Sequence, residues 1–224
     1  MNKEYGSIRA IIFDLDGVLL STDRYHFLAW KLVAERLGVP FSEEVNDRLR
    51  GVSRMDCIEI LLENYTGEPL SLADKEALAA DKNEEYRSYI SELTPSVVED
   101  YVRETLGALR ARGYRLAVGS VSKNTKYILE KTDLIGFFDA ISDGTNITHS
   151  KPDPEVFLKA AQMLGVEPCA CAVVEDAVVG IEAAASGGML PVAIGSAWES
   201  PLSRERIGSV ADLTFLFCEF EHNC

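Results

Sequence analysis

The sequence has few histidines, few cysteines and no long apolar run. Three histidines and five cysteines occur among its 224 residues, and no two cysteines form a C-x-x-C pair. No histidine lies at ligand spacing from a cysteine, so we expect no structural zinc site. No run approaches about 18 consecutive apolar residues, and the polar N-terminus leads into Ile11 and Ile12 without a signal-peptide core. We therefore expect a soluble, cytoplasmic protein.

Basic residues are also scarce. There are 22 Lys and Arg against 36 Asp and Glu, so the formal net charge is −14 at pH 7. A field of this sign repels phosphate polymers and anionic lipid surfaces. We expect no nucleic-acid partner, no membrane partner and a monomeric protein. If the substrate is anionic, a local group of positive charges must attract it.

Short apolar runs alternate with segments of helical period along much of the chain. Apolar strands without polar alternation are typical of a parallel sheet that helices cover on both faces. Right-handed crossovers then predict an α/β fold with a doubly wound, Rossmann-like sheet. The tail is ambiguous, and one interpretation is an edge strand at Ala211–Phe215. The expected strands are 10–13, 116–119, 140–142, 172–174 and 190–194.

The segment between the first two strands is too long for one crossover and has no convincing strand pattern. It shows helical patterns at 25–37, 55–65 and 72–90, separated by breaks that contain Gly or Pro. We predict that residues 22–94 form a helical cap domain, inserted after the first strand. Residues 1–21 and 95–224 would form the α/β core.

The sharpest local motif is Asp14-Leu15-Asp16-Gly17, directly after the first strand. Two carboxylates at this spacing can point into the crevice at the carboxyl end of the sheet, where ligands bind in doubly wound folds. Gly17 permits a sharp turn. One carboxylate could act as a nucleophile and the other could exchange protons. The alternative is an ordinary acidic turn.

Three further groups of polar residues follow later strands. The run Ser120–Asn124 opens a helix and offers hydroxyls, amides and an ammonium to a phosphate, although a plain serine cap is favoured for this run taken alone. Lys151 begins Lys-Pro-Asp-Pro, where a solvated lysine is the alternative. Glu175 and Asp176 end the fourth strand. Carboxylates from two strand ends make an oxygen site suited to Mg²⁺, whereas the alternative is mutual repulsion in solvent.

In this order, the motifs resemble those of the haloacid dehalogenase superfamily of phosphotransferases, whose members often carry a helical cap after the first motif. Further segments resemble the β-phosphoglucomutase family within it, from about Ile11 to Gly195. Those segments are Phe13–Val18, Thr22, Tyr25–Lys31, Gly51–Arg54, Lys82-Asn83, Ser120–Asn124 and Ser150–Pro152.

The resemblance implies a role for each matching residue. Asp14 would be the nucleophile that becomes an aspartyl-phosphate, and Asp16 the general acid and base. Mg²⁺ would be held by Asp14, the main-chain carbonyl of Asp16 and Asp176, with Glu175 in or beside the coordination shell. Ser120, the Val121 amide and the catalytic Lys151 would bind the transferring phosphate. The second phosphate would be bound by Arg54, Ser122, Lys123 and Asn124, and Lys82 would contribute to sugar-phosphate binding. Thr22 and His26 would lie at the hinge.

The cap residues also have ordinary interpretations. His26 could be a packed core histidine, Arg54 a solvated arginine at a helix start, and Lys82 part of a wet helix face in a charged run. The resemblance implies a Mg²⁺-dependent enzyme that converts β-glucose 1-phosphate to glucose 6-phosphate through a bisphosphate. A sugar-phosphate phosphatase is the main alternative. A non-catalytic phosphosugar-binding protein is disfavoured because both Asp14 and Asp16 are present.

Overall fold

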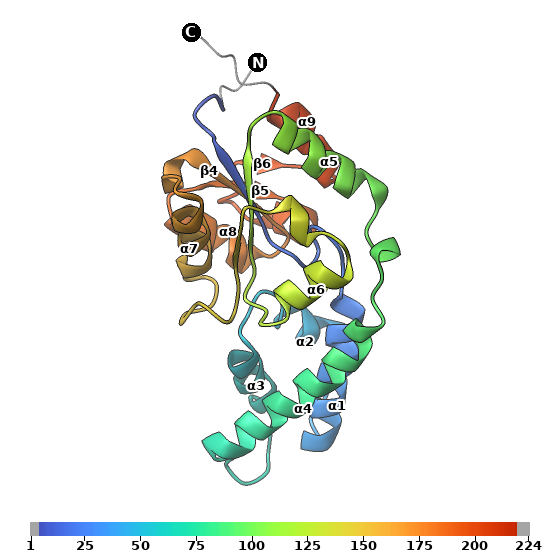
Figure 1. Ribbon diagram of the computed structural model, residues 1–224. Helices are drawn as coiled ribbons and strands as arrows, with labels where there is room; N and C mark the ends of the chain where they lie inside the picture. The colour runs from blue at the N-terminus through green and yellow to red at the C-terminus, as the bar shows by residue number, and fades with distance from the viewer. Residues whose placement is uncertain (1–4, 219–224) are drawn as a thin grey trace. The chain divides into compact units, whose positions relative to one another are not determined.

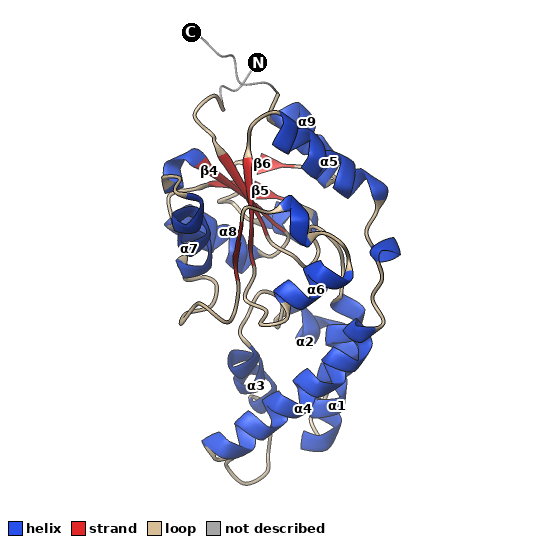
Figure 2. Cartoon of the chain, in the orientation of Figure 1, coloured by secondary structure: helices blue, strands red, loops and turns tan. Residues whose placement is uncertain are grey.

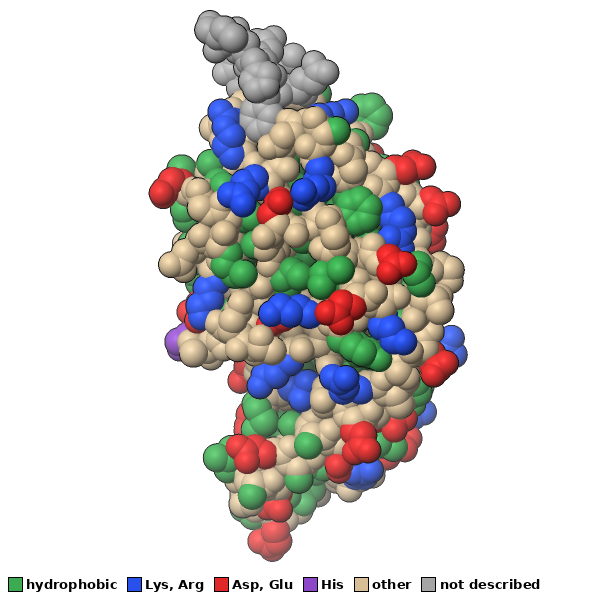
Figure 3. Space-filling view, in the orientation of Figure 1, with side chains coloured by type: hydrophobic (Ala, Val, Ile, Leu, Met, Phe, Trp, Pro, Cys, Tyr) green, Lys and Arg blue, Asp and Glu red, His purple; other side chains and the backbone are tan. Residues whose placement is uncertain are grey.

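The computed structural model describes residues 5–218 and divides the chain into two compact units. One unit comprises Met1–Ser21 and Thr94–Cys224, and the other comprises Thr22–Leu93. Among the described residues, no helix is both long enough and apolar enough to span a bilayer. Basic and acidic side chains are interspersed on the face shown in Figure 3, so the net negative charge does not form a surface of one sign there.

The first unit is built on a six-stranded sheet in the order β3-β2-β1-β4-β5-β6, and every neighbouring pair is parallel (Figures 1 and 2). This arrangement confirms the predicted α/β class with a doubly wound sheet. Its central strands carry no polar side chain before their carboxyl ends, because both faces are covered. The strands are β1 (Ala10–Phe13), β2 (Arg115–Gly119), β3 (Ala140–Ser142), β4 (Cys171–Glu175), β5 (Leu190–Ala193) and β6 (Glu205–Arg206).

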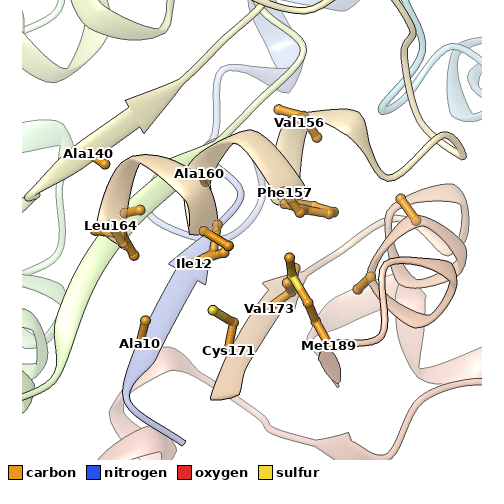
Figure 4. Close-up of a cluster of buried hydrophobic side chains, with 14 residues drawn as sticks. Ala10, Ile12, Ala140, Val156, Phe157, Ala160, Leu164, Cys171, Val173 and Met189 are labelled. Atoms are coloured by element: carbon orange, nitrogen blue, oxygen red, sulfur yellow. The ribbon is translucent and has the colours of Figure 1, made fainter. Parts of the chain in front are cut away.

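Helices cover the two faces of this sheet. One face, centred on Ile12 and Val173, packs against Phe157 of α7 and Ala184 of α8 in a buried cluster (Figure 4). Helix α5 lies on the opposite side of the sheet from α7 (Figure 1). The α-helices of this unit are α5 (Asp100–Ala111), α6 (Thr125–Lys131), α7 (Glu155–Leu164), α8 (Val178–Ser186) and α9 (Leu213–Leu216). The short 3₁₀ helices are Pro95–Val97, Ile135–Phe137, Pro168–Ala170, Gly195–Glu199 and Val210–Asp212.

The edge strand expected at Ala211–Phe215 is wrong. Ser209 and Asp212 form a reciprocal capping box there, which starts a 3₁₀ helix that continues into α9. The sheet edge is instead β6, whose two residues are too few to show a periodic pattern.

The second unit is helical and has its own core. It contains α1 (Asp23–Leu37), α2 (Glu43–Asp47), α3 (Arg54–Leu62) and α4 (Leu72–Ser91). Serine side chains start the last three helices by accepting a backbone N–H, as Ser53 does from Asp56. Trp30, Ile58 and their neighbours from α1 and α3 bury the apolar faces of this unit.

Candidate active site

Strand register places the first acidic residue beside the second acidic pair. Phe13 of β1 pairs with Val174 of β4, and the Asp14 amide donates a 3.0 Å hydrogen bond to the Val174 carbonyl. Asp14 and Glu175 therefore leave the sheet next to one another, at the carboxyl ends of its two central strands. Both side chains are buried. The fold thus concentrates carboxylates where doubly wound sheets bind ligands.

The turn after β1 depends on Gly17. Its φ is +74°, and its amide donates to the Leu20 carbonyl at 2.8 Å. A Cβ at this position would lie 2.1 Å from Asp176 Oδ2. Only glycine permits both the left-handed backbone and the close approach of the Asp176 carboxylate.

Lys151 joins the acidic residues from the loop before α7. Its ammonium lies 2.6 Å from Asp14 Oδ1 and 3.3 Å from Glu175 Oε1, and 4.7 Å from the centre of the Phe157 ring. The Lys151 side chain is fully buried, so the sequence-based alternative of a solvated lysine is wrong. Burial acts to lower the pKa of Lys151, but the two carboxylates outweigh it and the pKa is raised. Lys151 is therefore a fixed positive charge beside Asp14.

Burial raises the pKa of Asp14, although Lys151 opposes this shift. Burial raises the pKa of Glu175 further above its usual range, and the charges of Asp14 and Asp176 add to the effect. The positive charge of Lys151 therefore only partly offsets the burial and mutual repulsion of the neighbouring carboxylates.

The carboxylates of Asp14, Glu175 and Asp176 fit a divalent cation. One oxygen from each lies within 4.8 Å of the others, and the buried Glu175 Oε2 has no hydrogen-bond partner among the described residues. A Cβ at Gly180 would lie 1.8 Å from Glu175 Oε1, so the small residue in the first turn of α8 makes room for this carboxylate. A hard-oxygen set with an unsatisfied buried acceptor suits Mg²⁺.

The loop after β2 offers polar groups from the adjacent strand. The buried Ser120 hydroxyl accepts the Ser122 amide at 3.3 Å, and the Ser122 hydroxyl accepts the Asn124 amide at 3.2 Å. Val121 is half-buried and Lys123 is exposed. Serine side chains thus organise this turn, and the turn precedes α6 as the sequence predicted.

Within the helical unit, three of the predicted residues gather around Tyr86. The Thr22 and Tyr86 hydroxyls are 2.8 Å apart, and the His26 ring centre lies 4.1 Å from the Tyr86 ring centre. Lys82 Nζ lies 2.8 Å from His26 Nδ1, and 4.5 and 4.9 Å from the Tyr86 and Trp30 ring centres. Lys82 is buried, so the interpretation of a wet helix face is wrong. The charged neighbours of Lys82 suggest a solvated position. Tyr86, four residues later, lies on the same inward face of α4 and is the residue whose spacing indicates burial.

Arg54 is the first residue of α3, and its guanidinium donates a 2.8 Å hydrogen bond to Asn83 Oδ1. The side chain is half-buried, which lowers the pKa of Arg54, and no described carboxylate forms an ion pair with it. Its side chain is therefore only partly accessible to solvent, at the helix start that the sequence indicated.

Sequence reasoning did not single out Tyr86, Gly180 or Ser196. Ser196 follows β5, and its hydroxyl donates to the Asp176 carbonyl at 2.7 Å. Only Tyr86 carried a signal, namely its helical spacing from Lys82.

Comparisons with known proteins identify the family to which the chain belongs. A family model described as haloacid dehalogenase-like hydrolase matches residues 8–188. The chain is 41% identical over 189 residues to β-phosphoglucomutase of Bacillus subtilis (strain 168), covering 84% of each chain. It is 33% identical over 187 residues to a phosphorylated carbohydrates phosphatase of Thermotoga maritima, covering 81% of this chain and 82% of the relative. A crystal structure of β-phosphoglucomutase from Clostridium difficile superposes with a TM-score of 0.87 at 33% identity, covering 93% of this chain and 94% of that one. The chain belongs to the haloacid dehalogenase-like hydrolase family.

Proposed function

We propose that this protein is a Mg²⁺-dependent phosphomutase that converts β-D-glucose 1-phosphate to glucose 6-phosphate. The reaction would pass through an aspartyl-phosphate on Asp14 and a 1,6-bisphosphate intermediate. The observation that supports it most is the buried Asp14, 2.6 Å from the Lys151 ammonium and within a group of three carboxylates. The identity to a β-phosphoglucomutase supports the choice of sugar.

In this mechanism, an Asp14 oxygen attacks phosphorus as the bond to the sugar oxygen breaks. Charge on the transferring phosphoryl group is spread over its oxygens, so fixed positive charge accelerates the step. Lys151 supplies that charge from the protein, and Ser120 with the Val121 amide would bind the same group. Mg²⁺, held by Asp14, the Asp16 carbonyl and Asp176 with Glu175 nearby, would supply further electrostatic stabilisation when bound.

Asp16 would act as general acid and base on the sugar oxygen. It lies two residues after Asp14, and its backbone N–H donates a hydrogen bond to the Asp14 carboxylate. That contact orients the nucleophile, and the Asp16 carboxyl group would exchange the proton with the sugar oxygen.

A mutase must also hold a second phosphate while the first is transferred. We assign this role to Arg54, Ser122, Lys123 and Asn124, with Lys82 contributing to sugar-phosphate binding. Thr22 and His26 would act at the hinge. Arg54 suits the task because a guanidinium without a described carboxylate partner can donate two hydrogen bonds to a phosphate.

The second candidate is a sugar-phosphate phosphatase, in which water takes the phosphoryl group from Asp14. The Thermotoga maritima relative is a phosphatase, and the groups around Asp14 serve both reactions. What separates the two is retention of the bisphosphorylated sugar and exclusion of water from the aspartyl-phosphate.

The test is to incubate the protein with Mg²⁺, β-glucose 1-phosphate and a trace of the 1,6-bisphosphate. We expect glucose 6-phosphate with little inorganic phosphate, and loss of turnover after chelation. Inorganic phosphate as the main product would select the phosphatase. No turnover of either kind would refute both candidates.

Arg54→Ala provides a second measurement. We expect glucose 6-phosphate formation to fall steeply, whereas hydrolysis of acetyl phosphate, which has no second phosphate, should fall much less. An unchanged ratio of the two rates would count against the mutase.

A further inference from the structure

One carboxylate fastens the loop that carries Lys151. Glu155 is the first residue of α7, and its Oε2 accepts the backbone amides of Thr148 at 2.8 Å and His149 at 2.6 Å. The Thr148 hydroxyl donates to the same oxygen at 2.9 Å. Three donors from two consecutive loop residues thus converge on a single side-chain oxygen, two residues before Lys151.

The other oxygen of Glu155 is engaged as well. Lys159, one turn later on α7, lies 2.8 Å from Oε1, and its ammonium also donates to the Asn146 carbonyl in the same loop. Hydrogen bonds from Lys159, His149 and Thr148 lower the pKa of Glu155, so it stays ionised at neutral pH. Although His149, Asp153 and Glu155 could be taken for a cation site, the Glu155 oxygens are already occupied by donors of the loop and of α7.

We propose that Glu155 is a positioning residue for phosphoryl transfer, which holds the loop from Asn146 to Ser150 so that Lys151 reaches Asp14. The inference rests on the proposed function, because it assigns Lys151 to the transferring phosphate. A lysine has four rotatable side-chain bonds, so its ammonium is held in place only if its backbone is fixed. Loss of the Glu155 contacts would let the loop shift, and displacement by about 1 Å can lower a rate by about 100-fold.

Four variants distinguish the effects of the length of the Glu155 side chain, its charge and the general stability of the loop. Glu155→Ala removes every contact of the side-chain carboxylate. Glu155→Asp keeps the charge and the acidic residue at the helix start but shortens the side chain by one methylene. Glu155→Gln keeps an acceptor oxygen at the original reach and removes the charge. The control, Asp153→Ala, removes a negative charge from the same loop but only one hydrogen bond, from the Glu155 amide at 2.9 Å.

The assay is consumption of β-glucose 1-phosphate with Mg²⁺, counting both products, together with the inhibition constant of inorganic phosphate. We expect kcat/KM to fall by about 10- to 100-fold in Glu155→Ala and by about 10-fold in Glu155→Asp. Glu155→Gln and Asp153→Ala should stay within about 3-fold of the wild type. The inhibition constant of inorganic phosphate should rise in Glu155→Ala and Glu155→Asp. All measurements are made at a temperature where circular dichroism shows the wild type and the four variants folded.

Equal activity of Glu155→Asp and the wild type would overturn the positioning role. An equal loss in Asp153→Ala would also overturn it, since loop charge or helix stability would then explain the effect. Glu155→Asp keeps the inference testable if Glu155→Ala does not fold. A wild type that turns over no phosphate ester refutes the proposed function instead, so the two failures are distinguishable.

Discussion

Replacing Lys151 with methionine tests the charge balance of the site. Methionine is apolar and similar in length, so the variant removes the ammonium without leaving a large cavity. Asp14 and Glu175 then remain buried at the ends of adjacent strands without the cation that lies between them. The physical effect is therefore an uncompensated pair of acids.

The size of the effect follows from the distances. At an effective dielectric constant of about 20, contacts of 2.6 and 3.3 Å correspond to attractions of about 6 and about 5 kcal/mol. The desolvation of the buried ammonium offsets much of this attraction. Removing one member of such a buried group costs about 3–5 kcal/mol in practice. We expect the free energy of unfolding to fall by that amount at pH 7.5, with chelator present.

The loss in the free energy of unfolding should be smaller at acidic pH. Without Lys151, the already raised pKa of Glu175 rises further, so the folded state keeps a proton that the unfolded chain releases above its ordinary carboxyl pKa. The folded state then binds more protons than the unfolded state, and stability falls as pH rises through that window. The variant should therefore lie closer to the wild type at pH 5 than at pH 7.5.

Urea unfolding at both pH values measures the effect. Lys31→Met is the matched control, because its side chain is half exposed and its ammonium lies 4.0 Å from Oε1 of the exposed Glu35. A pair of this kind contributes about 0–1 kcal/mol. A Lys151→Met loss no larger than the control's, and independent of pH, would refute the account of the site.

Two further predictions concern a glycine and the thiols. Gly17→Ala should lower the free energy of unfolding by about 1–3 kcal/mol, since φ is +74° there. It should also weaken Mg²⁺ binding by titration calorimetry, because the new Cβ displaces Asp176; unchanged affinity would contradict this. Burial raises the pKa of Cys57 to about 12 and that of Cys171 to about 11, so at pH 8 neither should react with an aromatic disulfide while the exposed Cys169 does. Mass mapping identifies the labelled thiols, and rapid labelling of Cys57 in the folded protein would be the contrary result.

The sequence predicted the parallel sheet and the meeting of its acids for one reason. Asp14 and Glu175 each follow an uninterrupted apolar run, and parallel strands end at the same edge of a sheet. Nothing local distinguishes Lys151 from a solvated lysine, because its two partners are 137 and 24 residues away in the chain. Tertiary structure alone decides that its ammonium is buried.

Lys82 and the C-terminal tail show where pattern reasoning fails. The charged residues around Lys82 suggest a solvated face, but the rings of Trp30 and Tyr86 provide a buried environment for its ammonium. In the tail, the alternating apolar and polar residues at 211–215 suit a strand, but the capping box at Ser209 starts a helix first. In both cases specific contacts override the composition of the segment.

The central place of β1 in the sheet has a consequence for biosynthesis. Ala10 leaves the ribosome long before its partners, which are Arg115 on one side and Cys171 on the other. At about 5–20 residues per second, β1 waits about 8–30 s for its second neighbour. The contiguous segment Thr22–Leu93 is complete long before that and has its own apolar core. The inserted helical unit is therefore complete before the sheet, and the carboxylates of Asp14, Glu175 and Asp176 meet only after translation has passed Asp176.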